Sequence, residues 1–191
     1  VEEVYLTIIK SLSVFEKILL FVENEEILKR VEQLLVKIEV DLSNIVLHVY
    51  PINDIWARDC GPIFVKRDKE FVITDWEYNV WGEKYPPWDS DNDIPKYIAD
   101  HYDIECISTQ MILEGGSIDV NGAGDLLTTE SVLLNQNRNS EMNKKEIEQN
   151  LRTYLGAENI IWLKSGLVGD DTDGHIDDLT RFLSKDTVVT M

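Results

Sequence analysis

The chain has 191 residues, of which 43% are hydrophobic and 28% are charged, a balance that is ordinary for a globular protein with a substantial core. Its 36 acidic residues outnumber its 18 basic residues and give a formal net charge of −18. A field of this sign repels phosphate backbones and anionic lipid surfaces, so we expect no nucleic-acid partner and no membrane partner. The field attracts cations, although a strongly acidic composition alone is more typical of a merely soluble surface.

The two cysteines, Cys60 and Cys106, show no spacing typical of a disulfide framework or a zinc knuckle. The first residues lack the pattern of a secretory signal, and no apolar run reaches membrane-spanning length. We therefore expect a reducing, cytoplasmic location. The chain has no initiating methionine and ends at residues 187–191 in a strand-like run, so we also expect it to be a fragment.

The first half of the chain predicts four strands and two helices. The strand signals are short apolar or alternating runs at residues 17–22, 45–50, 63–66 and 71–76. Asn24 is a suitable helix cap, and the apolar residues after it recur at helical spacing as far as Ile38. A loop rich in aromatic residues and proline follows at 81–88, before a second helix expected at about residues 93–101.

The second half repeats these signals. Strands are expected at residues 104–109, 118–120, 125–129 and 159–163, and residues 132–134 are expected to extend the sheet. Asn121 and Gly122 predict the turn of a hairpin. Ser140 is expected to cap a helix that runs to about Leu155 and stops at Gly156.

Three acidic segments follow strand-like runs at similar intervals along the chain. They contain Asp59, Glu114 and His175, which are separated by 55 and 61 residues. The order strand, strand, helix, strand recurs with nearly the same period, which indicates a radial repeat. Equivalent loops of such a repeat would meet at one rim, where carboxylates and a histidine would bind a cation.

Each segment also has an ordinary structural interpretation. The neighbours Arg58 and Asp59 would form an ion pair, residues 114–117 a tight turn, and His175 a hydrogen-bonded structural histidine. The acidic run at residues 170–178 lacks the glycine and the terminal glutamate of a calcium-binding loop, so we expect no metal there.

Four segments, taken together, resemble motifs of the agmatine deiminase and bacterial (Porphyromonas-type) peptidylarginine deiminase family. They are residues 54–62 (DIWARDCGP), residues 78–87 (YNVWGEKYPP), residues 114–118 with 127–130 (EGGSI and LTTE), and residues 171–177 (DTDGHID). The motifs stand in the family's order, and the resemblance covers essentially residues 15–191. Four motifs in order are far more specific than any one of them.

The resemblance implies an α/β fold of the guanidine-modifying (pentein) superfamily. This fold is a five-bladed propeller of repeated ββαβ units, and the chain would supply about three blades as a single partial domain over residues 1–191. An incomplete ring leaves strand edges open, so the presence of a homo-oligomer stays an open question.

The resemblance also assigns roles to the acidic residues. Asp59 and Asp177 match the family's guanidinium-binding aspartates. A guanidinium is planar, permanently charged and rich in paired N–H donors, which suit a carboxylate fork. His175 matches the general acid/base, because imidazole readily gives and takes protons near neutral pH. Glu114 would orient and charge that imidazole.

Two tryptophans complete the expected site. Trp56 and Trp81 would line the pocket and stack on the flat cation of a small guanidino substrate. The implied reaction is hydrolysis of agmatine to N-carbamoylputrescine with release of ammonia, through a cysteine thiouronium intermediate. It requires no metal and no cofactor.

The chain departs from the family pattern at the nucleophile. The family's catalytic cysteine lies in a glycine-rich segment that this chain does not contain, and neither Cys60 nor Cys106 matches it. We therefore expect the 191-residue chain alone to be inactive. Three alternatives stay open: a non-catalytic guanidinium-binding protein, a deiminase of arginine or peptidylarginine, and an amidinotransferase or dihydrolase of the same fold.

Overall fold

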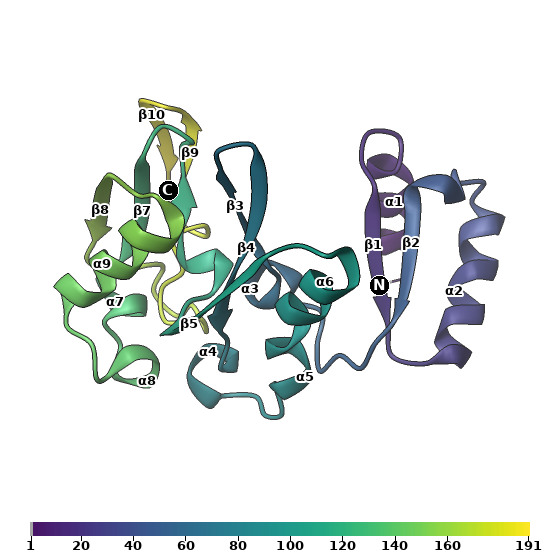
Figure 1. Ribbon diagram of the computed structural model, residues 1–191, viewed down its shortest axis with the longest axis horizontal. Helices are drawn as coiled ribbons and strands as arrows, with labels where there is room; N and C mark the ends of the chain where they lie inside the picture. Colours follow the sequence, from purple (N-terminus) through teal and green to yellow (C-terminus); the bar gives the residue numbers. More distant parts are fainter. Residues whose placement is uncertain (1) are drawn as a thin grey trace. The chain divides into compact units, whose positions relative to one another are not determined.

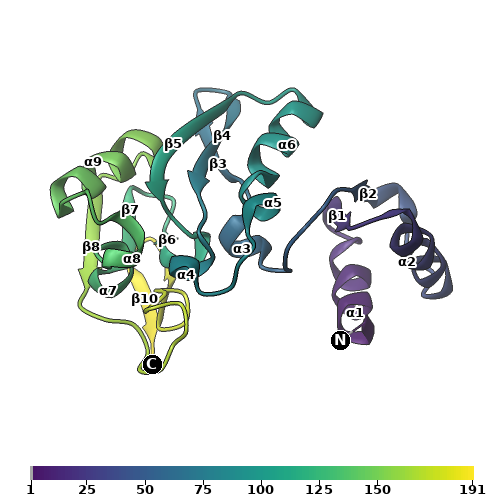
Figure 2. The ribbon, with the colours of Figure 1, turned by 90° about the horizontal axis from the view of Figure 1, so that it is seen from below.

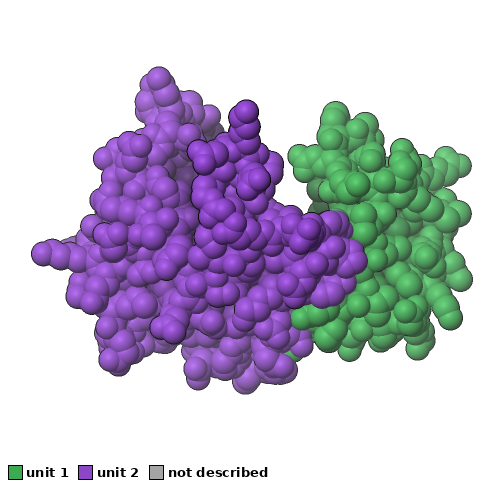
Figure 3. Space-filling view, in the orientation of Figure 1, with its two compact units in different colours: residues 1–53 green, residues 54–191 purple. Residues whose placement is uncertain are grey.

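The computed structural model describes residues 2–191. They form two compact units, divided between Asn53 and Asp54 (Figure 3). Strands and helices alternate along both units, so the predicted α/β class is confirmed. The single partial domain over residues 1–191 stays a prediction.

The first unit is built on one pair of parallel strands. Its elements are α1 (Glu2–Leu12), β1 (Ile18–Val22), α2 (Glu25–Lys37), the 3-10 helix η1 (Leu42–Asn44) and β2 (Ile45–Val49). The Asn24 side chain accepts hydrogen bonds from the backbone N–H groups of Glu26 and Ile27 and so caps α2. The predicted strands and the capped helix are confirmed, whereas α1 was not predicted.

The second unit contains two three-stranded sheets with the same topology (Figure 1). The first sheet consists of β3 (Ile63–Arg67), β4 (Glu70–Glu77) and β5 (Cys106–Ile112), and the second of β6 (Asp119–Val120), β7 (Asp125–Thr129) and β8 (Asn159–Leu163). In each sheet an antiparallel hairpin is followed by a strand that pairs in parallel with the second strand of the hairpin. The predicted ββαβ repeat is therefore confirmed.

Helices fill the connections within these repeats (Figures 1 and 2). Before β5 come α4 (Val80–Glu83), α5 (Asp89–Asn92) and α6 (Ile94–Tyr102); before β8 come α7 (Glu130–Leu133), α8 (Gln136–Asn139) and α9 (Lys144–Leu155). The short helix α3 (Ala57–Cys60) opens the unit, and the hairpin of β9 (Thr180–Ser184) and β10 (Thr187–Thr190) closes it.

The core of the second unit joins both sheets through α9. Ile147 and Leu151 of α9 are fully buried and share one apolar cluster with Met111 of β5 and Leu126 of β7. Burying aliphatic side chains of this size stabilises a fold by about 1.5–3 kcal/mol each. The shared cluster fixes the distance between the loops that follow β5 and β8.

Two details of the predicted elements are wrong. Residues 132–134 do not extend the sheet: α7 occupies residues 130–133, since the Thr129 hydroxyl accepts a hydrogen bond from the N–H of Val132 and caps a helical turn. Asn143, rather than Ser140, caps α9, because its side chain and that of Glu146 form a reciprocal capping box. The stop at Gly156 is confirmed by its left-handed φ of 69°.

Across residues 2–191, every helix is too short or too polar to cross a bilayer.

Candidate active site

Asp59 lies on the short helix α3, and its side chain is almost closed to solvent. The side chain is 8% exposed. Its Oδ1 atom accepts a hydrogen bond of 2.9 Å from the backbone N–H of Gly116, and its Oδ2 atom accepts one of 3.1 Å from Nε1 of Trp81. One donor on each oxygen fixes the plane of the carboxylate and leaves lone pairs for a ligand.

Gly116 connects the three acidic segments. Its N–H binds Asp59, and its carbonyl oxygen accepts a hydrogen bond of 3.3 Å from the backbone N–H of Asp177. A Cβ atom at this position would lie 2.4 Å from Nδ1 of His175 and 2.7 Å from Oδ1 of Asp59. Glycine is therefore required here by close approach.

His175 lies between two carboxylates. Its Nδ1 atom is 3.8 Å from Oδ1 of Asp59 and 4.0 Å from Oδ1 of Asp177. The residue is 3% exposed, and its backbone N–H donates to the side chains of Asp170 and Thr172. The three side chains that the sequence assigns to substrate and proton transfer thus converge in space, although they come from distant segments.

The negative charge of Asp177 is only partly compensated by neighbouring cations. Burial raises the pKa of this carboxyl above its ordinary value, and the nearby cations lower it only in part. The Arg58 guanidinium approaches Oδ2 to 3.6 Å, but the Arg58 side chain is 54% exposed. The carboxylate would therefore gain from a second cation in the site.

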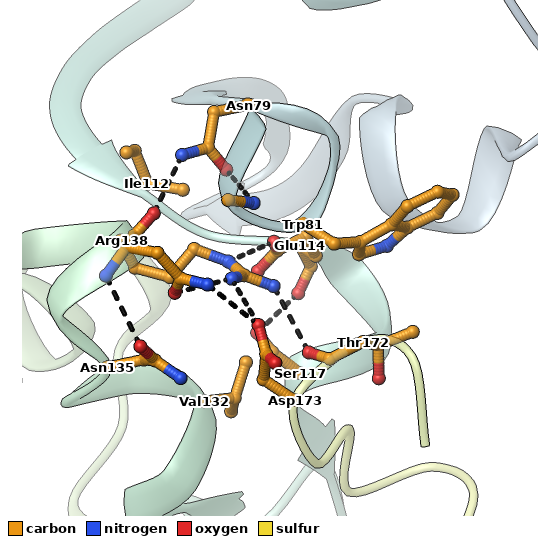
Figure 4. A network of polar contacts seen from close by, with 12 residues as sticks. Asn79, Trp81, Ile112, Glu114, Ser117, Val132, Asn135, Arg138, Thr172 and Asp173 are labelled. Carbon is orange, nitrogen blue, oxygen red and sulfur yellow. Dashed lines mark hydrogen bonds and ion pairs between the residues drawn. The ribbon is translucent and has the colours of Figure 1, made fainter. Parts of the chain in front are cut away.

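Glu114 is fully buried at the end of the segment that follows β5. Its Oε1 atom accepts a hydrogen bond of 2.5 Å from Nε of Arg138, whose side chain is also fully buried (Figure 4). Oε2 of Glu114 and Nε2 of His175 are buried and have no hydrogen-bond partner among residues 2–191. The structure thus holds Glu114 through Arg138, and its role toward His175 stays a prediction.

The two tryptophans stand against each other beside Asp59. Trp56 and Trp81 pack edge to face with ring centroids 5.5 Å apart. Trp81 is 6% exposed, and Tyr78 and Tyr85 also pack against its ring. Trp56 is 46% exposed and is therefore the more accessible surface for stacking.

The Trp81 turn has an unusual backbone. Val80, Trp81, Gly82 and Glu83 all have positive φ, at 47°, 59°, 88° and 62°. Side chains in this left-handed region cost roughly 1 kcal/mol or more each, and such strain concentrates at functional sites. Here the turn delivers the indole N–H to Asp59.

The segment before His175 is held by a neighbouring strand. The Thr129 hydroxyl, at the end of β7, donates a hydrogen bond of 2.7 Å to the carbonyl oxygen of Gly174. Residues 127–130 thus contribute to the site by positioning the histidine loop.

These arrangements agree with what the chain matches among known proteins. A family model described as Porphyromonas-type peptidyl-arginine deiminase matches residues 1–191. The chain belongs to this family.

Several solved structures with similar folds are named as deiminases. An agmatine deiminase of C. jejuni, a cysteine-to-serine variant with substrate bound, aligns with a TM-score of 0.87 and 36% identity over 99% of this chain and 56% of that chain. The agmatine deiminase of Enterococcus faecalis gives 0.89 and 33% over 99% and 52%. The predicted fold, part of a pentein α/β propeller, is confirmed by these matches.

A curated relative gives the same result. A Legionella pneumophila protein, provisionally named an agmatine deiminase, is 40% identical over 149 residues, which are 78% of this chain and 43% of that protein. The chain therefore spans about half the length of the relatives that it matches.

Cys60 of this deiminase-family chain is poorly suited to nucleophilic attack. The thiol is buried, and burial together with Asp91 and Asp59 raises its pKa to about 12. Its Sγ atom donates a hydrogen bond of 3.3 Å to the carbonyl oxygen of Trp56. The thiolate, which is the reactive form, is accordingly disfavoured at neutral pH.

Asp170 has a local structural role in the acidic loop. Its side chain accepts hydrogen bonds from the backbone N–H groups of Thr172, Gly174 and His175. In the described part of the chain, no three His, Cys, Asp or Glu residues are grouped so as to hold a metal ion.

Arg138 and Gly116 were missed as individual site residues by sequence reasoning. Arginine is usually a surface residue, and Arg138 stands in a polar, asparagine-rich run that gives no local sign of burial. The available signal was electrostatic, since a buried Glu114 requires a counter-charge from elsewhere. Gly116 lies within the motif of residues 114–118, but its contacts with Asp59 and Asp177 depend on tertiary structure.

Proposed function

We propose that this protein takes part in the hydrolysis of agmatine to N-carbamoylputrescine and ammonia. The observation that carries the proposal is the convergence of the Asp59 and Asp177 carboxylates on Nδ1 of His175, within 4.0 Å. A planar cation fits this acidic arrangement, and the family membership points to a guanidino group.

Binding would depend on the two aspartates. Each carboxylate accepts N–H groups of the guanidinium, and each charge-assisted hydrogen bond contributes about 1.5–3 kcal/mol. Trp56 supports the flat face of the cation, while Trp81 holds Asp59 through its indole N–H. The second positive charge of agmatine would be favoured by the net charge of −18.

His175 would act as the general acid/base. In the proposed reaction a cysteine thiolate, supplied from outside this chain, bonds to the central guanidinium carbon, and the C–N bond to a terminal nitrogen breaks. That nitrogen leaves as ammonia with a proton from His175. Water then adds to the same carbon with loss of a proton to His175. Cleavage of the C–S bond releases the ureido product and restores the thiolate, while the proton of the added hydroxyl group passes to solvent.

Glu114 would orient the imidazole. Its buried position and the unpartnered atoms Oε2 of Glu114 and Nε2 of His175 support this assignment. General acid/base catalysis of this kind typically contributes 10²–10⁴-fold to the rate.

Three substitutions in the full-length protein test the proposal. Asp59→Asn, Asp177→Asn and His175→Ala are each expected to abolish formation of ureido product from agmatine, measured together with ammonia. The control is Asp186→Asn, whose exposed carboxylate accepts hydrogen bonds from the hydroxyl groups of Ser184 and Thr187 and which is expected to leave turnover unchanged. Normal turnover after the first three changes would refute the assignment.

A non-catalytic guanidinium-binding protein is the second candidate function. The buried thiol of Cys60 and the raised pKa of Cys106 favour it, because neither cysteine of the chain is poised to attack. Saturable binding of agmatine by the full-length protein without ammonia release would establish this candidate instead. Parallel titrations with arginine and a peptide ending in arginine would reveal a different substrate.

The proposed location is the cytoplasm. Cys60 and Cys106 are both free thiols, which supports a reducing compartment.

A further inference from the structure

Arg138 is a buried cation that joins the two acidic loops of the site. Its side chain has no solvent exposure, and it makes four hydrogen bonds (Figure 4). Nε donates to Oε1 of Glu114, Nη1 to Asp173 and Asn137, and Nη2 to the carbonyl oxygen of Thr172, at distances between 2.5 and 3.1 Å. The guanidinium thus spans from the segment after β5 to the loop that carries His175.

The backbone around Arg138 is anchored on both sides. The side chain of Asn139 donates to the carbonyl oxygen of Ile112 and accepts from its N–H, at 3.0 and 2.9 Å. The carbonyl oxygen of Asn137 accepts a hydrogen bond of 2.9 Å from the side chain of Asn79. Helix α8 is therefore fixed to the end of β5, and Arg138 projects from a rigid base.

The contacts of Arg138 continue to His175. Thr172, whose carbonyl oxygen binds Arg138, also accepts a hydrogen bond of 3.1 Å on Oγ1 from the backbone N–H of His175. Asp173 has a left-handed φ of 68°, which is strained for a residue with a side chain. Burial alone would raise the pKa of Asp173, but hydrogen bonds from Lys84, Asn137 and Arg138 lower it, so an ionised Asp173 holds this bend.

The energetics argue for a role beyond stability. Burying an ion pair removes both charges from water, and the attraction between the charges only about offsets this desolvation cost. An apolar pair of similar volume is often as stable. A guanidinium nevertheless has a property that an apolar side chain lacks, because its donors point in fixed directions toward several acceptors at once. Arg138 uses this property to connect two loops that are 24 to 35 residues away in sequence.

We propose that Arg138 is a positioning residue: it ties the Glu114 carboxylate to residues 172–173 and thereby fixes the loop that presents His175 and Asp177 to a guanidinium. One part of this inference, that the loop presents His175 and Asp177 to a guanidinium, rests on the proposed function. The link itself consists of contacts within the chain and is testable without substrate.

Two variants separate positioning from charge compensation. Arg138→Lys keeps the charge but offers donors from a single point, so it cannot span Glu114 and Thr172 together. The double variant Glu114→Gln with Arg138→Gln removes both buried charges and leaves no uncompensated ion. The matched control is Arg67→Lys, since Arg67 forms a two-pronged pair with Glu105 at the exposed surface.

The first measurement is hydrogen exchange of the His175 amide, together with the pH titration of its imidazole signal by NMR. Both variants are expected to exchange this amide about tenfold faster than the parent, the scale of one lost charge-assisted hydrogen bond, while amides of β3 and β4 stay unchanged. The imidazole titration midpoint is expected to move in both variants and to stay unchanged in Arg67→Lys.

The second measurement is the affinity for agmatine by calorimetry. Arg138→Lys is expected to weaken binding about tenfold at an unchanged fold, as judged by circular dichroism. Absence of binding by the parent would count against the proposed function, whereas the exchange and titration results would still decide the role of Arg138. Exchange and titration like those of the parent in a folded variant would overturn the inference. Global unfolding of both variants would also overturn it, because Arg138 would then stabilise the whole fold rather than position one loop.

Discussion

At the residue scale, aspartates of one acidic loop differ in how their charge is compensated. Asp173 is held by Lys84, Asn137 and Arg138, and these hydrogen bonds lower its pKa despite burial. Asp177, four residues later, has a raised pKa because burial outweighs the help from His175 and Arg58. The loop therefore contains one carboxylate, that of Asp173, which stabilises the loop, and a second, that of Asp177, whose negative charge is only partly compensated. An incompletely compensated carboxylate is what a cationic ligand would find favourable.

The pKa of Asp177 leads to a pH prediction. A raised folded-state pKa means that its stabilising contribution is fully present below the ordinary value of 3.8 and is lost as pH rises through the folded pKa. Asp177→Asn is accordingly expected to raise the free energy of unfolding at pH 7 by about 1 kcal/mol and to change it little at pH 3. Chemical denaturation at both pH values measures this.

Ligand affinity should depend on pH in the opposite direction. Only the ionised Asp177 attracts a guanidinium, so we expect agmatine affinity to fall as pH is lowered through the raised pKa. A destabilised Asp177→Asn protein at pH 7, or an affinity that increases toward acid pH, would show that this view of Asp177 is wrong.

At the element scale, the site is a set of loops that hold one another. The turn of residues 114–117 supplies Gly116, whose N–H and carbonyl groups bind the α3 aspartate and the backbone of Asp177. The end of β7 holds Gly174, and α8 holds the loop from the other side. Asp59, Glu114 and Asp173 are each held by a hydrogen bond from another segment of the chain.

Gly116→Ala tests this arrangement. The added Cβ would lie 2.4 Å from Nδ1 of His175 and 2.7 Å from Oδ1 of Asp59, so both side chains must move. We expect agmatine affinity to fall at least about tenfold, because a charge-assisted hydrogen bond is lost. The control is Gly122→Ala, where a Cβ meets nothing within 4 Å and only the φ of 70° imposes a cost. Equal affinities for the parent and the Gly116→Ala variant would contradict this role.

The sequence predicted most elements because their signals are local. Asn24 and Gly156 end helices through their own side-chain and backbone chemistry, and the hairpins follow from alternating residues around tight turns. The wrong predictions arose where the same residues suit two different local structures. Apolar residues 132–134 suit a strand, but the Thr129 hydroxyl caps a helical turn at the same place.

The site was predictable only in part, for a similar reason. Asp59, His175 and Asp177 stand in motifs whose resemblance to a family brings them together before any coordinates are known. The contacts that hold them are non-local: Gly116 approaches His175 from 59 residues away, and Arg138 reaches Glu114 across 24 residues. Neither contact leaves a pattern in the neighbouring sequence.

At the scale of the whole molecule, 36 acidic residues outnumber 18 basic residues, and the candidate site is itself acidic. Such a field attracts a small cation from a distance and weakens with salt, since the Debye length is about 8 Å at physiological ionic strength. Selectivity would come from the carboxylates near His175, because the general field acts on any cation.

The most direct test is an NMR titration of the histidine side chains with agmatine. The chain has only three histidines, His48, His101 and His175, so each imidazole signal is assignable by substitution. We expect agmatine to shift the His175 signal saturably, the other two to stay in place, and a linear diamine without the guanidino group to have a much weaker effect. An unmoved His175 signal at saturating agmatine, or equal shifts with the diamine, would contradict the claim that these carboxylates and this imidazole form a guanidinium site.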